Sequence, residues 1–306
     1  RGIMQVEKLW DKLRKILDEN QILRNEPMKR HTTFQTGGPA DWYLLPRYEQ
    51  LAPLIALLRE RDTEITIIGN GSNLLVGDGG IRGAVVEIGK AMQEITVSGK
   101  TIKAQAGAIL GSVVSKAGQN GLTGMEFAAG IPGSVGGAMV MNAGAYGGEM
   151  KDVAAKVKVL TPQGEMIELG ADEMEFGYRK SVVSEKGYVV LEAEFVLVPG
   201  EKEEIKRKME ELKRQRISKQ PLEYPSAGST FKRPEGYFAG KLIMDCGLSG
   251  FSVGGAQVSE KHCGFVINRG GSAADVLAVI SHVQKKVKER FGVELETEVK
   301  LVGEFL

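Results

Sequence analysis

Cysteine and histidine are scarce in this sequence. Its 306 residues include two cysteines, Cys246 and Cys263, and three histidines, His31, His262 and His282. The cysteines form no CxxC motif and are too few for a disulfide framework, which favours a reduced, cytoplasmic protein. The histidines are scattered, with no HExxH or mixed Cys/His cluster, so we expect no metal site.

An excess of charge of one sign is also missing. Forty Lys and Arg residues against 39 Asp and Glu leave a formal net charge of +1. Nucleic-acid-binding proteins usually carry a basic surplus, so no nucleic-acid partner is expected. No apolar run approaches the roughly 20 residues needed to cross a bilayer, and the charged start RGIMQVEKLWDKL lacks a signal-peptide core. These absences favour a soluble cytoplasmic protein without membrane insertion.

The hydrophobic patterns that are present predict an α+β protein with at least two lobes. Helical spacing covers residues 6–17, 109–120 and 201–219, and Ser272 can cap a further helix whose apolar face carries Val276, Val279, Ile280, Val283 and Val287. Strand patterns cover residues 64–68, 84–88, 188–198 and 293–305, with hairpins at 95–106 and 157–169.

A first glycine cluster, Gly69-Asn70-Gly71-Ser72-Asn73-Leu74, directly follows the strand pattern ITIIG. The cluster lacks a third glycine, and its continuation LLVGDGGIRG is not helical, which departs from the Rossmann fingerprint. Exposed amides together with a hydroxyl and a carboxamide can nevertheless cradle a pyrophosphate without a helix. A purely structural turn is the alternative.

A second cluster reads GIPGSVGGA over residues 130–138 and continues as MNAGAYGG over 141–148. The run SVGGA is suited to open a short buried helix whose N-terminal amides face an anion; tight core packing is the alternative. A third pair, Gly37-Gly38 within TFQTGGPAD, could by itself be any turn.

The ordered set TGGPAD, GNGSNLL, GIPGSVGGAMVMNAGAYGGE, YRKS, PSAGSTFKRP, GGAQVS and LETEVK resembles the UDP-N-acetylenolpyruvoylglucosamine reductases over residues 32–304. The resemblance implies an FAD-binding fold of the vanillyl-alcohol oxidase type, not a Rossmann fold, and a smaller α+β substrate-binding lobe. It places the FAD-binding region at 4–200, in subdomains of about 4–90 and 91–200. The substrate-binding domain would be 201–292, and a strand at 293–306 would return to the FAD region with a catalytic glutamate.

The family's reaction is the NADPH-dependent reduction of UDP-N-acetylglucosamine enolpyruvate to UDP-N-acetylmuramate for peptidoglycan. FAD is expected to bind non-covalently, and its N5 hydride would attack the enolpyruvyl methylene carbon. The resemblance implies that Arg179 grips the substrate carboxylate, that Ser229 donates the proton, and that Glu298 orients the carboxylate end. A two-point guanidinium grip and a positioned hydroxyl suit those roles.

Glu294 and Glu296 compete with Glu298, because a strand would put all three side chains on one face. Only the motif LETEVK selects Glu298, and Lys300 would then point the same way and supply a cation. Fifty residues separate Arg179 from Ser229, which matches the shorter form of the family, without the tyrosine loop that closes over the substrate.

The remaining site residues are also assigned through the resemblance. The expected cofactor-binding residues are Thr36, Gly69, Asn70, Gly71, Ser72, Asn73, Leu74, Gly130, Ile131, Pro132, Gly133, Ser134, Gly136, Gly137, Asn142, Ala143 and Gly144. The expected substrate-binding residues are Tyr178, Arg216, Lys219, Lys232, Lys241, Gln257 and Lys300.

Two other functions remain open at the level of sequence. One is a different FAD oxidoreductase of the same fold that acts on a hydroxylated substrate. The other is a nucleotide-sugar-binding protein without turnover. Oxygen consumption with a hydroxylated substrate would favour the first, and flavin binding without reduction by NADPH would favour the second.

Overall fold

The computed structural model describes residues 2–306. The chain forms two compact units, each assembled from separate segments. Unit 1 comprises residues up to Arg24, Trp42–Asn70 and Gly83–Arg214. Unit 2 comprises Asn25–Asp41, Gly71–Arg82 and Gln215–Leu306. Each unit has its own apolar core, so each is described in turn.

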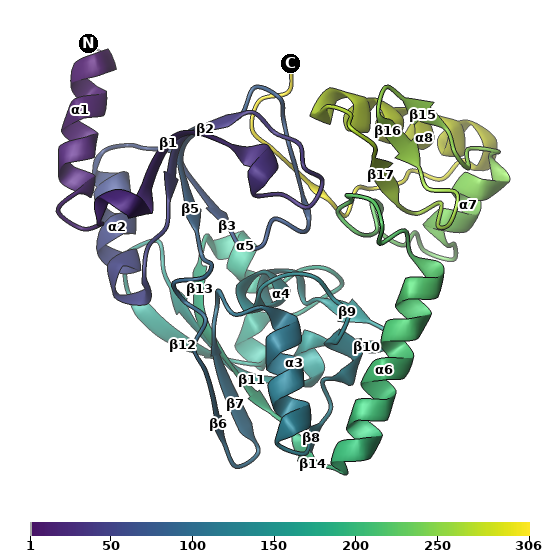
Figure 1. The fold of residues 1–306 in the computed structure, drawn as a ribbon, viewed down its shortest axis with the longest axis horizontal. Coiled ribbons are helices and arrows are strands. Elements are labelled where there is room, and N and C mark those ends of the chain that lie inside the picture. Colours follow the sequence, from purple (N-terminus) through teal and green to yellow (C-terminus); the bar gives the residue numbers. More distant parts are fainter. Residues whose placement is uncertain (1) are drawn as a thin grey trace. The chain divides into compact units, whose positions relative to one another are not determined.

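A five-stranded antiparallel sheet in the order β12-β11-β13-β7-β6 dominates unit 1 (Figure 1). Helices α3 and α4 pack against it, and fully buried residues such as Val157, Val159 and Phe195 fill the interior. The strands and helices are β6 (Ile95–Ser98), β7 (Thr101–Gln105), β11 (Ala154–Leu160), β12 (Met166–Gly170), β13 (Val189–Val196), α3 (Leu110–Gln119) and α4 (Val135–Met141).

A second sheet has the order β1-β2-β5-β3, in which β3 and β5 pair in parallel. Helices α1 and α2 pack together through buried leucines such as Leu13 and Leu54. The bounds are α1 (Gly2–Leu13), β1 (Ile22–Pro27), β2 (Pro39–Leu44), α2 (Tyr48–Glu60), β3 (Ile65–Ile68) and β5 (Ile81–Glu87). Shorter elements are β8 (Leu122–Thr123), β9 (Gly144–Ala145), β10 (Gly148–Glu149), α5 (Val182–Lys186) and β14 (Val198–Pro199), and the long helix α6 (Lys202–Lys219) follows them.

Unit 2 combines a small antiparallel sheet with helix α8, which packs on it (Figure 1). Its other sheet is a parallel pair in which β18, near the end of the chain, lies beside β4. The bounds are β4 (Leu74–Val76), α7 (Ala239–Asp245), β15 (Ser252–Val253), β16 (Ala256–Val258), β17 (Val266–Asn268), α8 (Ala273–Phe291) and β18 (Lys300–Val302). The pairing of β4 with β18 joins distant parts of the sequence within one unit.

Two side chains satisfy the amides at the start of α8. Ser272 is the N-cap and accepts a hydrogen bond from Asp275 N at 3.1 Å. Asp78, which follows β4, accepts from Ala273 N and Ala274 N, each at 2.9 Å. A carboxylate at a helix N-terminus both fills unpaired amides and interacts favourably with the helix dipole. Asp78 therefore ties the segment after β4 to the main helix of unit 2.

Replacement of Asp78 by alanine should lower the free energy of unfolding by about 1–2 kcal/mol, because two helix N-terminal amides lose their acceptor. Chemical denaturation of the wild type and the variant measures the difference. Asp11→Ala is the matched control, since Asp11 is exposed on α1 and should change stability by less than about 0.5 kcal/mol. Equal losses in both variants would contradict the capping role of Asp78.

Most elements with a strong local pattern are confirmed. The hairpins turn at Gly99 and Gly164, both with positive φ, and Ser272 caps α8, whose five predicted apolar residues are all buried. The helix expected over 6–17 ends at Leu13, and the strand expected over 84–88 is displaced to Ile81–Glu87. No helix within residues 2–306 is both long and apolar enough to cross a membrane.

The tail is where the expectation is wrong. The pattern over 293–305 predicts one strand or a strand pair, but only Lys300–Val302 is a strand there, and Thr297 makes an isolated bridge with Phe231. Residues 298 and 299 form a bend, because Glu298 N and Val299 N both donate to Thr230 O. The strand alternation that would align Glu294, Glu296 and Glu298 therefore does not exist.

Candidate active site

The first glycine cluster links two strands directly. Strand β3 ends at Ile68 and β4 begins at Leu74, which confirms that no helix follows the glycines. Gly71 has φ +65°, and a Cβ there would lie 2.0 Å from His31 O, so only glycine fits. The loop thus has no side chain at the point where its backbone lies against His31.

Within unit 2 the first and third clusters pack together. Gly71 O accepts a hydrogen bond from Thr33 N at 3.0 Å, and Gly38 N donates to Gly77 O at 3.0 Å. A Cβ on Gly38 would lie 2.1 Å from Asp78 O. Two glycine-rich segments that are separate in sequence therefore form one compact turn region.

Within unit 1 the first cluster meets the second. A Cβ on Gly69 would lie 2.4 Å from Ser134 Oγ, which shows how closely the two segments approach. Ser134 is the N-cap of α4 and accepts from Gly137 N at 3.3 Å, which confirms the short helix predicted for SVGGA. The segment is held from behind by Leu110 N, which donates to Gly133 O at 2.9 Å.

Arg179 lies in a tight turn between Gly177 and Lys180, whose backbones exchange hydrogen bonds of 3.1 and 3.4 Å. Its φ is +52°, a left-handed conformation that strains a residue with a side chain by about 1–3 kcal/mol. The guanidinium donates from Nη2 to Gly144 O at 3.3 Å and lies 5.2 Å from the centre of the Tyr178 ring. Strain of this kind concentrates at functional sites, which fits the role expected of Arg179.

Ser229 and Glu298 belong to unit 2, and adjacent backbone segments bring them together. Glu298 N donates to Thr230 O at 2.9 Å, directly beside Ser229. Asn73 Nδ2 donates to Glu298 O at 3.2 Å, and Lys300 N donates to Asn73 O at 3.0 Å. Ser229 is exposed and Glu298 is half-buried. Two of the three predicted catalytic residues thus share one locus with the first glycine cluster, whereas Arg179 belongs to unit 1.

The structure distinguishes among the three glutamates, which the sequence pattern could not. Glu294 is exposed and pairs with Lys288, and Glu296 is exposed and pairs with Lys232 at 3.3 Å. Glu298 alone is half-buried at the junction with Thr230. The other two carboxylates therefore lie in solvated ion pairs, and Glu298 is the one set beside the Ser229 segment.

Comparison with known proteins gives a consistent result over nearly the whole chain. Residues 220–302 match the family model described as UDP-N-acetylenolpyruvoylglucosamine reductase, C-terminal domain, and residues 43–170 match the model described as FAD binding domain. The UDP-N-acetylenolpyruvoylglucosamine reductase of Agathobacter rectalis is 59% identical over 297 residues, which cover 93% of this chain and 95% of the relative. That of Caldanaerobacter subterraneus subsp. tengcongensis is 55% identical over 300 residues, or 97% and 99% of the two chains.

The crystal structure of UDP-N-acetylenolpyruvylglucosamine reductase from Thermus caldophilus superimposes with a TM-score of 0.80 at 36% identity, covering 92% of this chain and 98% of that one. The chain belongs to the UDP-N-acetylenolpyruvoylglucosamine reductase family. Membership makes it an FAD-dependent oxidoreductase, and the predicted α+β fold with an FAD-binding domain is confirmed.

The described residues fit the flavin cofactor that this reductase family implies. Thr36, at 3% exposure, carries the one buried side-chain oxygen within the described part of the chain that has no hydrogen-bond partner. A buried hydroxyl without a partner is costly, and a bound group or an ordered water beside it would supply the missing hydrogen bond. Thr36 directly precedes the Gly37-Gly38 turn, which packs against Val76 and the backbone of Asp78, just after the first cluster. The orphaned hydroxyl and the glycine-rich backbone agree with a pyrophosphate-bearing ligand.

The other predicted cofactor residues of the second cluster differ in accessibility. Gly130, Ile131 and Gly133 are half-buried, whereas Pro132 is exposed and Ser134 is buried. Gly136 is half-buried and Gly137 is exposed at the start of α4.

Asn142 departs from a typical ligand contact. It is 0% exposed, and its side chain makes three hydrogen bonds within the protein. Ala143 and Gly144, which follow it, are half-buried, and Gly144 carries the carbonyl that receives Arg179.

The candidate substrate residues are more scattered. Lys232 and Lys241 lie in ion pairs with Glu296 and Asp245 at 3.3 and 3.0 Å. Gln257 donates to Gly250 O at 3.2 Å and accepts from Arg269 at 3.4 Å. Of the remaining candidates, Tyr178 and Lys219 are exposed, and half-buried Arg216 donates to Gln220 at 2.9 Å. Lys300 is exposed as a whole residue, but partial burial of its ammonium group lowers its pKa.

The structure also reveals residues that the sequence did not single out. Glu149 and Asn268 make buried or partly buried hydrogen bonds that hold site segments, Glu149 to Asn142 at 2.7 Å and Asn268 to Phe34 O at 2.8 Å. Glu149 ends the motif GIPGSVGGAMVMNAGAYGGE and Asn268 lies in no motif, but neither position signals its contact, because each contact depends on the tertiary fold. No group of three or more His, Cys, Asp or Glu side chains in residues 8–306 is placed to hold a metal ion.

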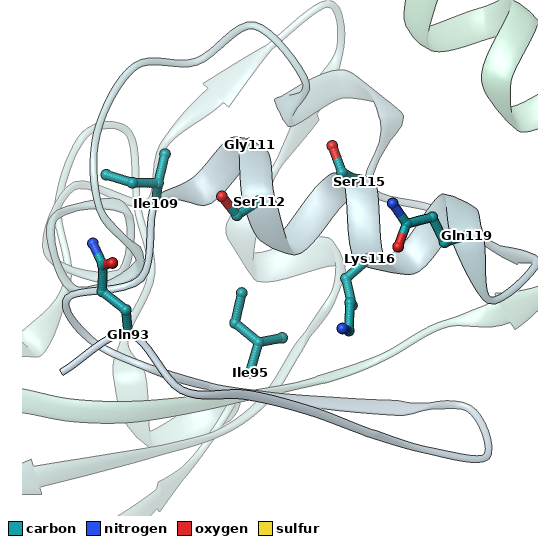
Figure 2. A pocket seen from close by; sticks show the side chains of 8 residues that line it. All are labelled: Gln93, Ile95, Ile109, Gly111, Ser112, Ser115, Lys116 and Gln119. Atoms are coloured by element: carbon teal, nitrogen blue, oxygen red, sulfur yellow. The ribbon is translucent and has the colours of Figure 1, made fainter. Parts of the chain in front are cut away.

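A groove of about 630 Å³ runs along α3 in unit 1. Figure 2 shows Ile95 of β6 facing the helix, with Ser112 and Lys116 on α3 and Ile109 at one end. Ile109 forms a β-bridge with Ser134. The groove therefore opens beside the second glycine cluster.

Proposed function

We propose that this chain catalyses the NADPH-dependent reduction of UDP-N-acetylglucosamine enolpyruvate to UDP-N-acetylmuramate, a step of peptidoglycan synthesis. Family membership supports the substrate class, because the most similar relatives carry that reductase's name. The observation that carries the proposal is the locus in unit 2, where Glu298 N donates to Thr230 O and Asn73 donates to Glu298 O. This locus joins a predicted proton donor, a predicted carboxylate-orienting residue and a predicted cofactor loop.

When bound, FAD supplies the hydride for the enolpyruvyl methylene carbon after its own reduction by NADPH. As that carbon gains hydride, negative charge develops on the neighbouring carbon and spreads into the substrate carboxylate. Arg179 opposes this charge, because its guanidinium remains protonated and can hold a carboxylate by two parallel hydrogen bonds. The turn at Gly177–Lys180, closed by two backbone hydrogen bonds, presents that guanidinium.

Ser229 delivers the proton to the carbon that carries the negative charge. A serine hydroxyl is a weak acid, so it needs a short approach to a strongly basic carbon and a favourable charge nearby. Neighbouring Thr230 is not a candidate for this role, because it is 1% exposed and its Oγ1 is turned toward Val266 N, 3.0 Å away. Glu298, held beside the serine segment, orients the carboxylate end of the substrate.

The test follows the flavin absorbance of purified holoenzyme without oxygen. Addition of NADPH should bleach the flavin band, and subsequent addition of UDP-N-acetylglucosamine enolpyruvate should restore it. Bleaching without recovery would refute the substrate assignment and favour another flavin oxidoreductase. Bound flavin that NADPH does not reduce would instead favour a nucleotide-sugar-binding protein without turnover.

A further inference from the structure

The turn that presents Arg179 is anchored to helix α4 on both sides. On one side, Gly177 O accepts from Asn142 Nδ2 at 3.0 Å. On the other, Ser181 Oγ donates to Val140 O at 2.9 Å. Val140 lies in the last turn of α4, and Asn142 is its C-cap. The left-handed backbone at Arg179 is thus held by two hydrogen bonds that originate in one short helix.

The amide of Asn142 has only one orientation that satisfies its neighbours. Its Nδ2 donates to Glu149 Oε2 at 2.7 Å as well as to Gly177 O, so both amide hydrogens are used. Its Oδ1 accepts from Lys151 N at 2.9 Å. A flipped amide would place an oxygen against a carboxylate and a carbonyl, and an NH2 group against a backbone N–H. The side chain is therefore locked by the protein itself.

The same network reaches the guanidinium end of Arg179. Glu149 lies on β10, which pairs with β9, and Gly144 of β9 carries the carbonyl that accepts from Arg179 Nη2 at 3.3 Å. A Cβ on Gly144 would lie 3.3 Å from Arg179 Nη1, so the side chain passes close over that strand. Asn142 thus connects the backbone of the turn with the strand pair against which the arginine side chain rests.

We infer that Asn142 is a positioning residue for Arg179, and that it acts through Gly177 O and Glu149 instead of binding the cofactor. The inference rests on the proposed role of Arg179 in holding the substrate carboxylate. Complete burial and the use of both amide hydrogens within the protein leave Asn142 no donor for a ligand. A small displacement of a group that grips a reacting substrate can lower its rate about 100-fold.

The test removes the side-chain amide of Asn142 and keeps a residue that can adopt the same left-handed backbone conformation. Asn142 has φ +45°, which glycine adopts readily, so Asn142→Gly deletes the hydrogen bonds without forbidding the helix cap. Flavin reoxidation by UDP-N-acetylglucosamine enolpyruvate should slow about 10- to 100-fold. Flavin reduction by NADPH and the Kd for FAD should stay within about threefold of the wild type. Asn120→Gly is the matched control, because Asn120 is the exposed C-cap of α3 and donates to Lys116 O at 2.8 Å.

A double variant separates positioning from general destabilisation. If Asn142 acts through Arg179, then Asn142→Gly combined with Arg179→Ala should reoxidise no more than about twofold slower than Arg179→Ala alone. Multiplicative losses, or a weakened Kd for FAD in Asn142→Gly, would overturn the inference while Arg179 keeps its role. Should Asn142→Gly fail to fold, flavin reduction and flavin reoxidation are measured in Asn142→Asp instead. Aspartate retains the shape of the side chain and replaces its NH2 donor by oxygen. Wild-type reoxidation in Arg179→Ala would instead refute the role of Arg179, and with it this inference.

Discussion

Ser229→Ala should reduce flavin reoxidation by UDP-N-acetylglucosamine enolpyruvate about 10²- to 10⁴-fold, the contribution expected of a positioned general acid. Reduction of the flavin by NADPH should remain within about threefold of the wild type, because that step needs no proton from the serine. Rapid-mixing absorbance measurements on the holoenzyme resolve the two half-reactions. Ser229 is exposed, so loss of its hydroxyl should not disturb the packing around it.

Ser226→Ala is the control for this variant. Ser226 belongs to the same loop, and its Oγ accepts from Gly228 N at 3.4 Å, so its removal perturbs the loop without deleting the predicted acid. We expect Ser226→Ala to reoxidise within about threefold of the wild type. Equal losses in both half-reactions of Ser229→Ala would show that Ser229 serves binding or structure and does not donate the proton.

Arg179→Lys should slow the same reoxidation about 10²- to 10³-fold, comparable to the loss of one donor that stabilises developing charge. Lysine keeps the positive charge but cannot hold a carboxylate by two parallel hydrogen bonds. The KM for the enolpyruvyl substrate should rise as well, since the carboxylate is also held before reaction. Steady-state and single-turnover rates of the holoenzyme measure both effects.

Lys180→Ala tests whether the effect belongs to the turn or to the guanidinium. Lys180 is the exposed neighbour of Arg179 in the same turn. The substitution Lys180→Ala therefore removes a positive charge but leaves the guanidinium that is proposed to hold the substrate carboxylate. Its reoxidation rate should stay within about threefold of the wild type. If Arg179→Lys and Lys180→Ala slowed the reaction equally, positive charge near the site would be sufficient and a specific grip would be ruled out.

Sequence patterns were reliable where a few neighbouring residues determine the conformation. Gly99 and Gly164 mark hairpins because tight turns need positive φ, and Ser272 marks α8 because its hydroxyl caps the helix. The missing third glycine after Gly71 and the non-helical continuation correctly indicated that no helix follows the first cluster, although the strand β4 that does follow was not predicted. These signals depend only on neighbouring residues, so they can be interpreted without knowledge of the tertiary fold.

Features fixed by distant pairings could not be predicted in this way. The tail bends at Glu298 because Thr230 O receives two amides, and nothing in LETEVK signals that contact. Asn142 stands within a family motif and is predicted to bind the cofactor, and nothing in that motif signals its hydrogen bonds to Gly177 and Glu149. The left-handed φ of Arg179 also depends on its surroundings, since arginine has no preference for that conformation.

The parallel pairing of β4 with β18 has a consequence for how the protein is made. Asn73 and Glu298, which are joined by a hydrogen bond, stand 225 positions apart, and Lys300 pairs with Leu74. During synthesis the ribosome therefore releases the segment around Asn73 long before its partners exist. Contacts so distant in sequence slow folding, and unpaired strands exposed meanwhile are prone to aggregate. Unit 2 can reach its native form only after residues around 300 have emerged, so the locus of Ser229 and Glu298 cannot assemble before then.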